Sequence, residues 1–234
     1  MALPQLNTAR YETTVPSTGQ TITYRPYLVK EEKILMLAME SEDQKQIVNA
    51  TKSMITSCVF DELDVNKLAM FDIESIFLAL RSKSVGETVG LKVKCTSCEK
   101  QNDVTVDFND VKVDVDSAQR DVRITDTVGI TMRYPSFDDI SGIKEGEEES
   151  IDTAFSLITN CIESIYDENG VYTPQTEGPT AIKNFVESLN STQFQELSVF
   201  FQNMPTLTHK IEFNCTGCTA HNETELKGLQ SFFI

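Results

Sequence analysis

Two short cysteine pairs are the residues of this chain whose types and spacing could do chemistry. They are Cys95-Thr-Ser-Cys98 and Cys215-Thr-Gly-Cys218. A tight Cys-x-x-Cys turn can hold half of a tetrahedral Zn²⁺ site with Zn–S bonds of about 2.3 Å, and two such turns supply all four ligands. We therefore expect these cysteines to bind one structural zinc ion that ties two distant parts of the chain together. The stretch between the pairs is far longer than in a compact zinc ribbon, so other interpretations stay open.

The alternatives are disulfides, a redox pair, free thiols and a mixed ligand set. Two disulfides are compatible with the six cysteines, although nothing else in the chain is typical of a secreted protein. A redox Cys-x-x-Cys normally opens a helix, whereas both pairs here lead into polar, turn-like sequence. The thiols could also be reduced and free of metal. In a mixed set, His209 or His221 would replace one cysteine ligand.

Strand-like sequence surrounds both pairs and would position them. Residues 88–94 and 103–108 flank the first pair as a predicted β-hairpin whose turn is the pair itself, and the alternating run 209–214 leads into the second pair. The two segments form a weak internal repeat of strand, cysteine pair, polar turn and return. The remaining cysteines, Cys58 and Cys161, lie among apolar residues and are expected to be buried core thiols.

Strand and helix patterns alternate along the rest of the chain. They predict an α+β fold with an N-terminal hairpin and helical layer, β-hairpins that carry the two cysteine knuckles, and helices inserted between them. Further hairpins are predicted over 11–15 with 20–24, over 121–125 with 129–134, and over 166–172, where Asn169-Gly170 would form the turn. Helices are predicted over 30–40, 73–81, 151–165, 179–189 and 191–203, and one more extends from Ser41 to about Cys58. Capping boxes are predicted from Ser41 with Gln44 and from Asn190 with Gln193, and Asp72 is the predicted cap of the helix over 73–81.

The predicted elements fall into four segments. These are 1–85, an N-terminal hairpin with helices; 86–135, a β-rich segment with the first knuckle; 136–205, a helical insert; and 206–234, the second knuckle with the C-terminal tail. We expect the knuckles to join the segments into one compact unit. The acidic run 142–150 is expected to be a solvated loop or a helix start.

Charge and hydropathy argue against two classes of protein. The 234 residues include 36 acidic and 20 basic ones, which gives a formal net charge of −16. A nucleic-acid-binding protein needs a basic face, so we expect no nucleic-acid partner. No apolar run approaches the roughly 20 residues that span a bilayer, and the N-terminus lacks the basic start and apolar centre of a signal peptide. We therefore expect a cytoplasmic protein without a membrane span.

Motifs for catalysis are poor. The two histidines both lie beside the second cysteine pair, which leaves no suitable base for a Ser-His-Asp arrangement. The ten glycines are scattered singly and form no phosphate-binding loop. Four cysteine ligands would leave a zinc ion no open coordination position for a substrate. We expect a binding or structural protein that is not an enzyme and has no small-molecule substrate.

The N-terminal part of the chain carries a more specific signal. The segment 15–41, and above all Tyr24-Arg-Pro-Tyr-Leu-Val-Lys-Glu-Glu-Lys33, resembles the baseplate hub or hub assembly family of T4-like contractile-tailed bacteriophages. The Cys-x-x-Cys near the C-terminus and the closing Leu-x-x-Phe-Phe are also similar to that family. The resemblance extends over nearly the whole chain and is strongest over residues 10–60.

The resemblance implies a role in tail morphogenesis, as a part or an assembly factor of the central hub. It implies other hub proteins or the tape-measure protein as partners, and the host cytoplasm during assembly and the virion tail baseplate as locations. Two alternatives stay open, namely a transient assembly chaperone absent from the virion and a zinc-ribbon adaptor unrelated to phage. The C-terminal run Phe232-Phe-Ile234 is expected to be either a docking tail or a core plug.

The candidate residues for partner binding lie within the most specific part of the resemblance. They are Tyr24, Arg25, Tyr27, Lys30 and Glu31. A rigid run of aromatic and guanidinium side chains suits the centre of a protein–protein interface. Alternatively, the two tyrosines could simply cover the helix that follows them.

Overall fold

The computed structural model describes residues 7–41, 43–113, 115, 119–141, 150–228 and 231. Over these residues the fold is α+β, as predicted, with eight α-helices and small antiparallel sheets. The chain forms two compact units, the first from residues up to 114 together with residues from 206 on, and the second from residues 115–205. The first boundary falls within the segment 86–135 that the sequence groups as one β-rich stretch. In the described part of the chain, no helix is both long and apolar enough to cross a bilayer.

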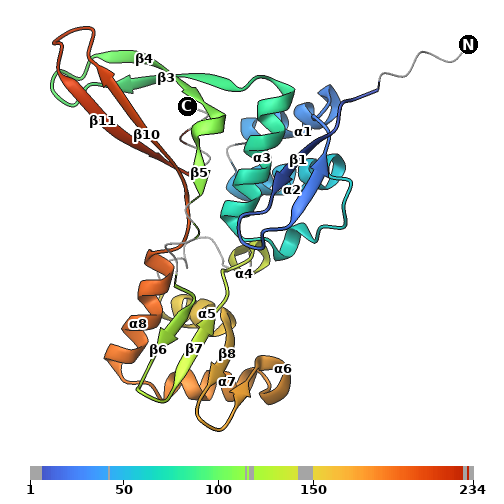
Figure 1. Cartoon of the computed structure of the whole chain (residues 1–234), viewed down its shortest axis with the longest axis vertical. Coiled ribbons are helices and arrows are strands. Elements are labelled where there is room, and N and C mark those ends of the chain that lie inside the picture. The colour runs from blue at the N-terminus through green and yellow to red at the C-terminus, as the bar shows by residue number, and fades with distance from the viewer. Residues whose placement is uncertain are drawn as a thin grey trace, which may run out of the picture. The chain divides into compact units, whose positions relative to one another are not determined.

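The first unit combines a short hairpin, three helices and two long hairpins (Figure 1). Its helices are α1 (Val29–Glu40), α2 (Gln44–Cys58) and α3 (Met70–Ser84), with the 3₁₀ turns η1 (Val65–Lys67) and η2 (Phe108–Asp110). Its strands are β1 (Tyr11–Thr14), β2 (Thr21–Tyr24), β3 (Thr88–Lys94), β4 (Gln101–Asp107), β5 (Lys112–Val113), β10 (Leu207–Asn214) and β11 (His221–Lys227). The predicted hairpins β1–β2 and β3–β4 are confirmed, and β10–β11 supplies the return strand that the internal repeat indicates.

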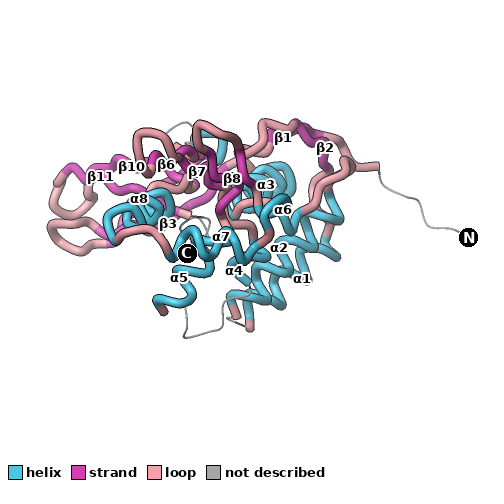
Figure 2. Tube along the Cα trace, turned by 90° about the horizontal axis from the view of Figure 1, so that it is seen from below, coloured by secondary structure: helices cyan, strands magenta, loops and turns pink. Residues whose placement is uncertain are grey.

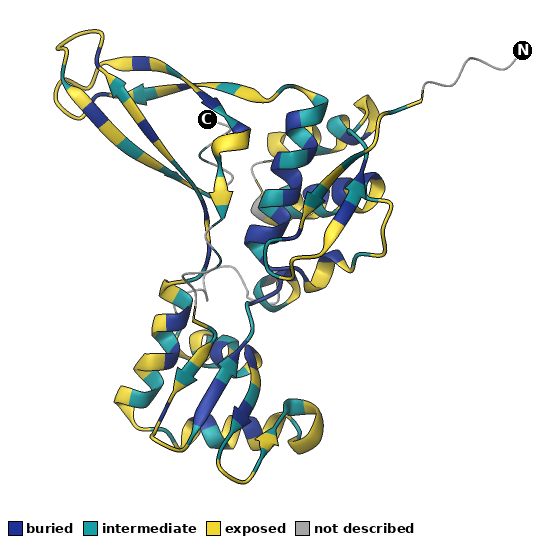
Figure 3. Ribbon diagram, viewed as in Figure 1, coloured by how far each residue is buried: buried dark blue, intermediate teal, exposed yellow. Residues whose placement is uncertain are grey.

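Helices α1, α2 and α3 lie side by side (Figure 2), and α3 carries most of the buried apolar side chains of this layer (Figure 3). Its buried apolar residues are Phe71, Ile73, Ile76, Phe77, Leu78 and Leu80. Burial of one such side chain stabilises a fold by about 1.5–3 kcal/mol. This helix is therefore the centre on which the rest of the unit packs.

Local capping chemistry differs from the prediction at the start of α2. The side chain of Asp43 caps the helix, because its Oδ1 accepts the backbone N–H groups of Lys45 at 2.9 Å and Gln46 at 3.3 Å. The predicted cap, Ser41, instead ends α1 and donates its hydroxyl to the carbonyl of Ala38. The Ser41/Gln44 capping box is thus wrong, since an aspartate two residues closer to the helix reaches the first free N–H groups directly.

The start of α3 also differs from the prediction. The helix begins at Met70, so Asp72 lies in its first turn and does not precede it. The buried Asp72 carboxylate accepts the N–H of Ala69 at 3.0 Å and, from the β1–β2 turn, the N–H of Ser17 at 2.8 Å and its hydroxyl at 2.6 Å. One carboxylate therefore caps α3 and fixes the N-terminal hairpin to it.

The second unit is a four-stranded antiparallel sheet packed against helices. Its strands follow the order β6 (Asp121–Arg123), β7 (Gly129–Met132), β8 (Ile162–Tyr166) and β9 (Val171–Tyr172). Its helices are α4 (Phe137–Ser141), α5 (Ile151–Asn160), α6 (Pro174–Glu177), α7 (Pro179–Glu187) and α8 (Ser191–Gln202). Its core joins apolar side chains of β7 and β8 to those of α5, α7 and α8, among them Met132, Ile162, Ile158, Ile182 and Leu197.

Two details of this unit differ from the sequence prediction. The helix predicted over 151–165 ends at Asn160, because the following residues form β8 between β7 and β9. The hairpin predicted over 166–172 is present, but Asp167 and Gly170 close its turn and Asn169 lies at the centre. The Asp167 carboxylate accepts the backbone N–H groups of Asn169 and Gly170, which explains the offset. The Asn190/Gln193 capping box of α8 is confirmed.

Two predicted segments lie outside the described residues. They are most of the acidic run 142–150 and the C-terminal run 232–234.

Candidate metal centre

The two cysteine pairs occupy the turns of two similar hairpins in the first unit. In β3–β4 the strands pair from Thr88 with Asp107 to Lys94 with Gln101, and in β10–β11 from Thr208 with Lys227 to Asn214 with His221. Apolar side chains beneath both hairpins form one core with α3, namely Leu78, Leu91, Val106, Phe108, Leu207 and Ile211. The strands and this core hold the two turns against each other (Figure 1).

The two turns have the same backbone hydrogen bonds. The N–H of Cys95 donates to the carbonyl of Lys100 at 2.9 Å, and the N–H of Glu99 donates to the carbonyl of Cys95 at 3.0 Å. The equivalent bonds of Cys215, with Ala220 and Thr219, measure 2.9 Å and 3.0 Å. The internal repeat inferred from the sequence therefore extends to the conformation of the turns.

The residue after each pair adopts an unusual backbone conformation. Glu99 and Thr219 both have φ of 60°, in the left-handed region that costs an L-residue about 1–2 kcal/mol. For a β-branched residue such as Thr219 this conformation is a clear outlier. A left-handed residue at the end of a short hairpin loop is a common way to reverse the chain, so the matching φ values show that the two turns share one conformation.

The four sulfurs converge as a metal site requires. The Sγ atoms of Cys95, Cys98, Cys215 and Cys218 all lie within 4.8 Å of one another. The Cys95–Cys218 and Cys98–Cys215 pairs are each separated by 3.6 Å. A tetrahedral ion with bonds of about 2.3 Å places its sulfurs about 3.8 Å apart, so the donor set fits such an ion. Four thiolates are typical of structural zinc sites and compatible with other soft metals.

Hydrogen bonds favour the thiolate form at the two buried sulfurs. The backbone N–H groups of Cys218 and Gly217 lower the pKa of Cys215 to about 6. The N–H of Ser97 is the main cause of the lowered pKa of Cys95. Since thiolates are the form that binds metal, these turns prepare both buried cysteines for coordination.

An exposed sulfur of the cluster has the opposite tendency. The N–H of Lys100 lowers the pKa of Cys98, but the sulfurs of Cys218, Cys215 and Cys95, together with a partial loss of solvation, outweigh it and raise the pKa to about 12. Neighbouring thiolates repel each other, so the four sulfurs can all be deprotonated only around a compensating cation.

The structure bears on the alternative interpretations of the cysteines. No disulfide joins any of the six cysteines, all of which lie in the described residues, and neither knuckle opens a helix as a thioredoxin-like redox pair would. Among the described residues, neither histidine belongs to the ligand cluster. His209 lies 3.4 Å from the carbonyl of Asp110, and His221 lies 3.3 Å from the side-chain oxygen of Asn214.

The two remaining cysteines are core residues, as predicted. Cys58 and Cys161 are 1 % and 0 % exposed. Burial raises the pKa of Cys58 to about 11 and that of Cys161 to about 12. Both thiols stay protonated at neutral pH, which suits side chains that fill the core.

Four further residues surround the sulfurs, and the spacing of the cysteines does not predict them. Thr96 and Asn102 follow the first cysteine of one pair by one and seven residues, and Thr216 and Asn222 follow that of the other pair in the same way. Their side chains connect the knuckles. Both segments read Cys-Thr-x-Cys-x-x-x-Asn, and this longer repeat is the signal that would have found them.

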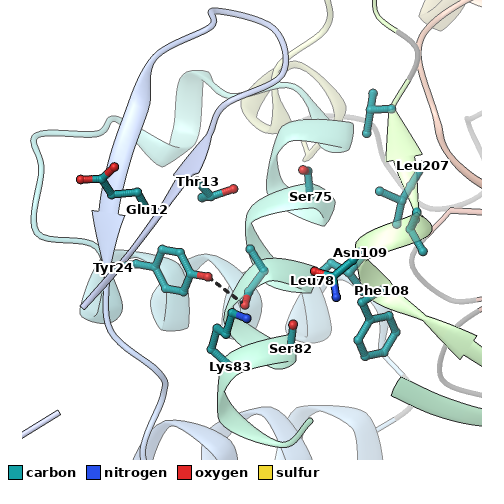
Figure 4. Close-up of a pocket in the computed structure, with 13 residues that line it drawn as sticks. Glu12, Thr13, Tyr24, Ser75, Leu78, Ser82, Lys83, Phe108, Asn109 and Leu207 are labelled. Carbon is teal, nitrogen blue, oxygen red and sulfur yellow. Dashed lines mark hydrogen bonds between the residues drawn. The ribbon is translucent and has the colours of Figure 1, made fainter. Parts of the chain in front are cut away.

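The structure places the predicted partner-binding residues in two environments. Tyr24 is 2 % exposed and donates its hydroxyl to the carbonyl of Ala79 at 3.2 Å, in the wall of a pocket of about 260 Å³ (Figure 4). The neighbouring Tyr27 is half-buried, and its backbone N–H donates to the hydroxyl of Ser84 at 2.9 Å. Both contacts are with α3, whereas the alternative drawn from the sequence has the tyrosines cover α1, the helix that follows them.

The charged candidates form a small network at the start of α1. The guanidinium of Arg25 lies 2.9 Å from the carboxylate of Glu31, and their side chains are 14 % and 5 % exposed. The same carboxylate accepts the N–H of Leu28 at 2.8 Å and so caps α1. Lys30 lies 3.3 Å from Glu31, and its side chain is 72 % exposed. Partner binding by this set stays a prediction.

The comparisons with known proteins point to one family. No curated protein and no solved structure matches the chain. The family model described as T4 bacteriophage base plate protein matches residues 8–234, which includes both knuckles and both units. This match agrees with the resemblance at the level of the baseplate. The chain therefore belongs to the family of T4 bacteriophage base plate proteins.

Proposed function

We propose that this chain is a non-enzymatic structural protein of the baseplate hub of a contractile phage tail, stabilised by one structural zinc ion. The observation that carries the proposal is the family match over residues 8–234, which spans the chain and not a single module. The hub, as one part of the baseplate, follows from the resemblance of residues 15–41. The proposed partners are other baseplate hub proteins or the tape-measure protein.

Zinc is the metal that the donor set favours. Four thiolates in a tetrahedral arrangement saturate the ion and leave no position for substrate or water, which suits a structural role and not a catalytic one. The second unit lies between the cysteine pairs in sequence, so the ion would connect the two chain segments that make up the first unit. Its proposed contribution is to hold these segments together after the chain has passed through residues 115–205.

The surface of α1 supports a role in an assembly. Several large apolar side chains of this helix are exposed, namely Val29 (80 %), Ile34 (51 %), Met36 (58 %), Leu37 (57 %) and Met39 (46 %). We infer from these exposed apolar residues that another protein covers α1. Because the family consists of baseplate proteins, we propose a neighbouring protein of the same baseplate as the occupant.

The experiment that tests the function is protein analysis of purified, finished tails, together with a phage in which this gene carries a stop codon. A hub component is expected in the finished tails at a fixed ratio to other baseplate proteins, and its loss should stop baseplate assembly. A protein needed for assembly but missing from finished tails would be the transient chaperone. Normal tails without the protein would contradict any role in the baseplate.

A further inference from the structure

Two buried asparagines connect the cysteine knuckles to each other. Asn102 in β4 and Asn222 in β11 are 5 % and 2 % exposed, and each lies beside one of the two buried sulfurs. Asparagine is rarely buried unless its amide is fully hydrogen-bonded. The partners of these two amides therefore indicate why the chain keeps them there.

The amide of Asn222 reaches across to the first knuckle. Its Oδ1 accepts both the backbone N–H and the hydroxyl of Thr96, each at 2.9 Å. Its Nδ2 donates to the carbonyl of Ala220 in its own knuckle at 2.9 Å and lies 3.5 Å from the sulfur of Cys95 in the other. The four hydrogen-bonding positions of the amide are thus all used, and they bridge the two turns.

The amide of Asn102 makes the reciprocal set of contacts. Its Oδ1 accepts the N–H and the hydroxyl of Thr216 at 2.8 Å and 3.0 Å. Its Nδ2 donates to the carbonyl of Lys100 at 2.8 Å and lies 3.7 Å from the sulfur of Cys215. Each asparagine thus holds the opposite knuckle by its threonine and contacts the first, buried cysteine of that knuckle.

We propose that Asn102 and Asn222 are positioning residues of the metal site, which set the two knuckles in register and aim the Cys95 and Cys215 sulfurs at a shared ion. The inference rests on the metal binding proposed above. Residues that orient the ligands of a metal from behind commonly change its affinity by 10- to 100-fold when they are replaced. Only a side-chain amide can both accept from the threonine and donate to the carbonyl and the sulfur.

The test is metal binding to the full chain with the variants Asn102→Asp and Asn222→Asp. Aspartate keeps the size of the side chain, but its carboxylate cannot donate to the carbonyl or the sulfur and places a negative charge beside a thiolate. Affinity for Zn²⁺ is measured by competition with a chelator, and Co²⁺ binding by its thiolate charge-transfer absorption. We expect each variant to bind Zn²⁺ 10- to 100-fold more weakly and to show an altered Co²⁺ spectrum.

The matched control is Asn214→Asp, which adds the same charge next to Cys215 from an exposed position. A milder variant, Thr216→Val, removes one hydroxyl from the Asn102 contacts and keeps the backbone N–H, so it remains informative if an aspartate variant fails to fold. We expect the control to bind Zn²⁺ as the wild type does and Thr216→Val to bind it several-fold more weakly.

The outcomes separate this inference from the proposed function. A wild type that binds one ion, with unchanged affinity and spectrum in both asparagine variants, would overturn the positioning role and leave the metal site intact. An equal loss in the Asn214→Asp control would also overturn it, since charge alone would then explain the effect. A wild type that binds neither Zn²⁺ nor Co²⁺ would overturn the metal site together with the inference.

Discussion

If one ion joins the two knuckles, replacing a cysteine in either knuckle should remove the same cross-link. We consider Cys95→Ser, Cys215→Ser and the double variant, each in saturating Zn²⁺. The cross-link closes a stretch of 120 residues, of which the second unit supplies 91. Loop-closure entropy gives about 5 kcal/mol for the whole stretch and about 4 kcal/mol for the 29 residues outside the second unit. Each single variant should therefore lose about 4–5 kcal/mol of unfolding free energy.

The decisive quantity is the unfolding free energy of the double variant. Two losses at one site do not add, so Cys95→Ser combined with Cys215→Ser should cost about as much as either change alone and not about 8–10 kcal/mol. Urea unfolding followed by circular dichroism, with and without a chelator, measures these values. The chelator should lower the unfolding free energy of the wild type to that of the variants, and it should leave the unfolding free energies of the variants unchanged. Additive losses, or a wild type insensitive to the chelator, would refute a shared ion.

Three further changes have consequences that the structure predicts. Arg25→Ala should lower the unfolding free energy by about 2 kcal/mol, because it leaves the buried Glu31 carboxylate without its main partner. Asp139→Asn should cost about 2 kcal/mol at neutral pH, because the Arg133 guanidinium and Ser136 outweigh burial and lower the pKa of Asp139 to about 2. This contribution is present above about pH 4 and is lost as the pH falls through about 2, so wild type and variant should converge there. Met36→Lys on exposed α1 should leave the melting temperature unchanged and reduce incorporation into tails.

Each of these predictions has a matched control in the chain. Lys30→Ala removes an exposed cation from the same carboxylate and should cost less than about 1 kcal/mol, so equal losses in both variants would contradict the role of Arg25. Asp126→Asn changes an exposed aspartate of the same unit and should change the unfolding free energy at neutral pH by less than about 0.5 kcal/mol. Val171→Lys places the same charge on another exposed apolar residue, and an equal assembly defect there would argue against α1 as the contact.

The sequence predicted those parts of the fold whose signals are local. The alternation of the strands around the first knuckle and the capping box at Asn190 both depend on residues that are close together in sequence, and the structure contains both as predicted. The errors occur where a contact between residues distant in sequence determines the local structure. Residues 162–165 have helical spacing, but pairing with β7 makes them part of the strand β8. Asp72 lies in the first turn of α3, where its carboxylate binds both Ala69 and the distant Ser17 of the N-terminal hairpin.

The site itself was predictable only in part. The spacing of the cysteines predicts the four sulfur ligands, since Cys-x-x-Cys pairs have few functions other than metal binding. A single asparagine or threonine carries no such chemical signal, because one asparagine in a strand is most often a surface residue, and only the repeat of these residues in both knuckles marks them. For Arg25, in contrast, the sequence carries a signal for an interface but none for the ion pair with Glu31. An arginine between tyrosines suits an interface, but its ion pair with Glu31 depends on how the chain enters α1, which composition does not reveal.

The long spacing between the knuckles, which argued against a compact zinc ribbon, has a structural explanation. The second unit begins after β5 and ends before β10, and these two strands pair with each other, Val113 with Leu207 and Lys112 with Thr208. The chain thus leaves and re-enters the first unit at neighbouring positions, which is the usual condition for inserting one compact unit into another. Without the insertion, Cys95 and Cys215 would be separated by 29 residues, close to the spacing of ordinary paired knuckles. The distance in sequence therefore records an insertion and does not count against a shared metal ion.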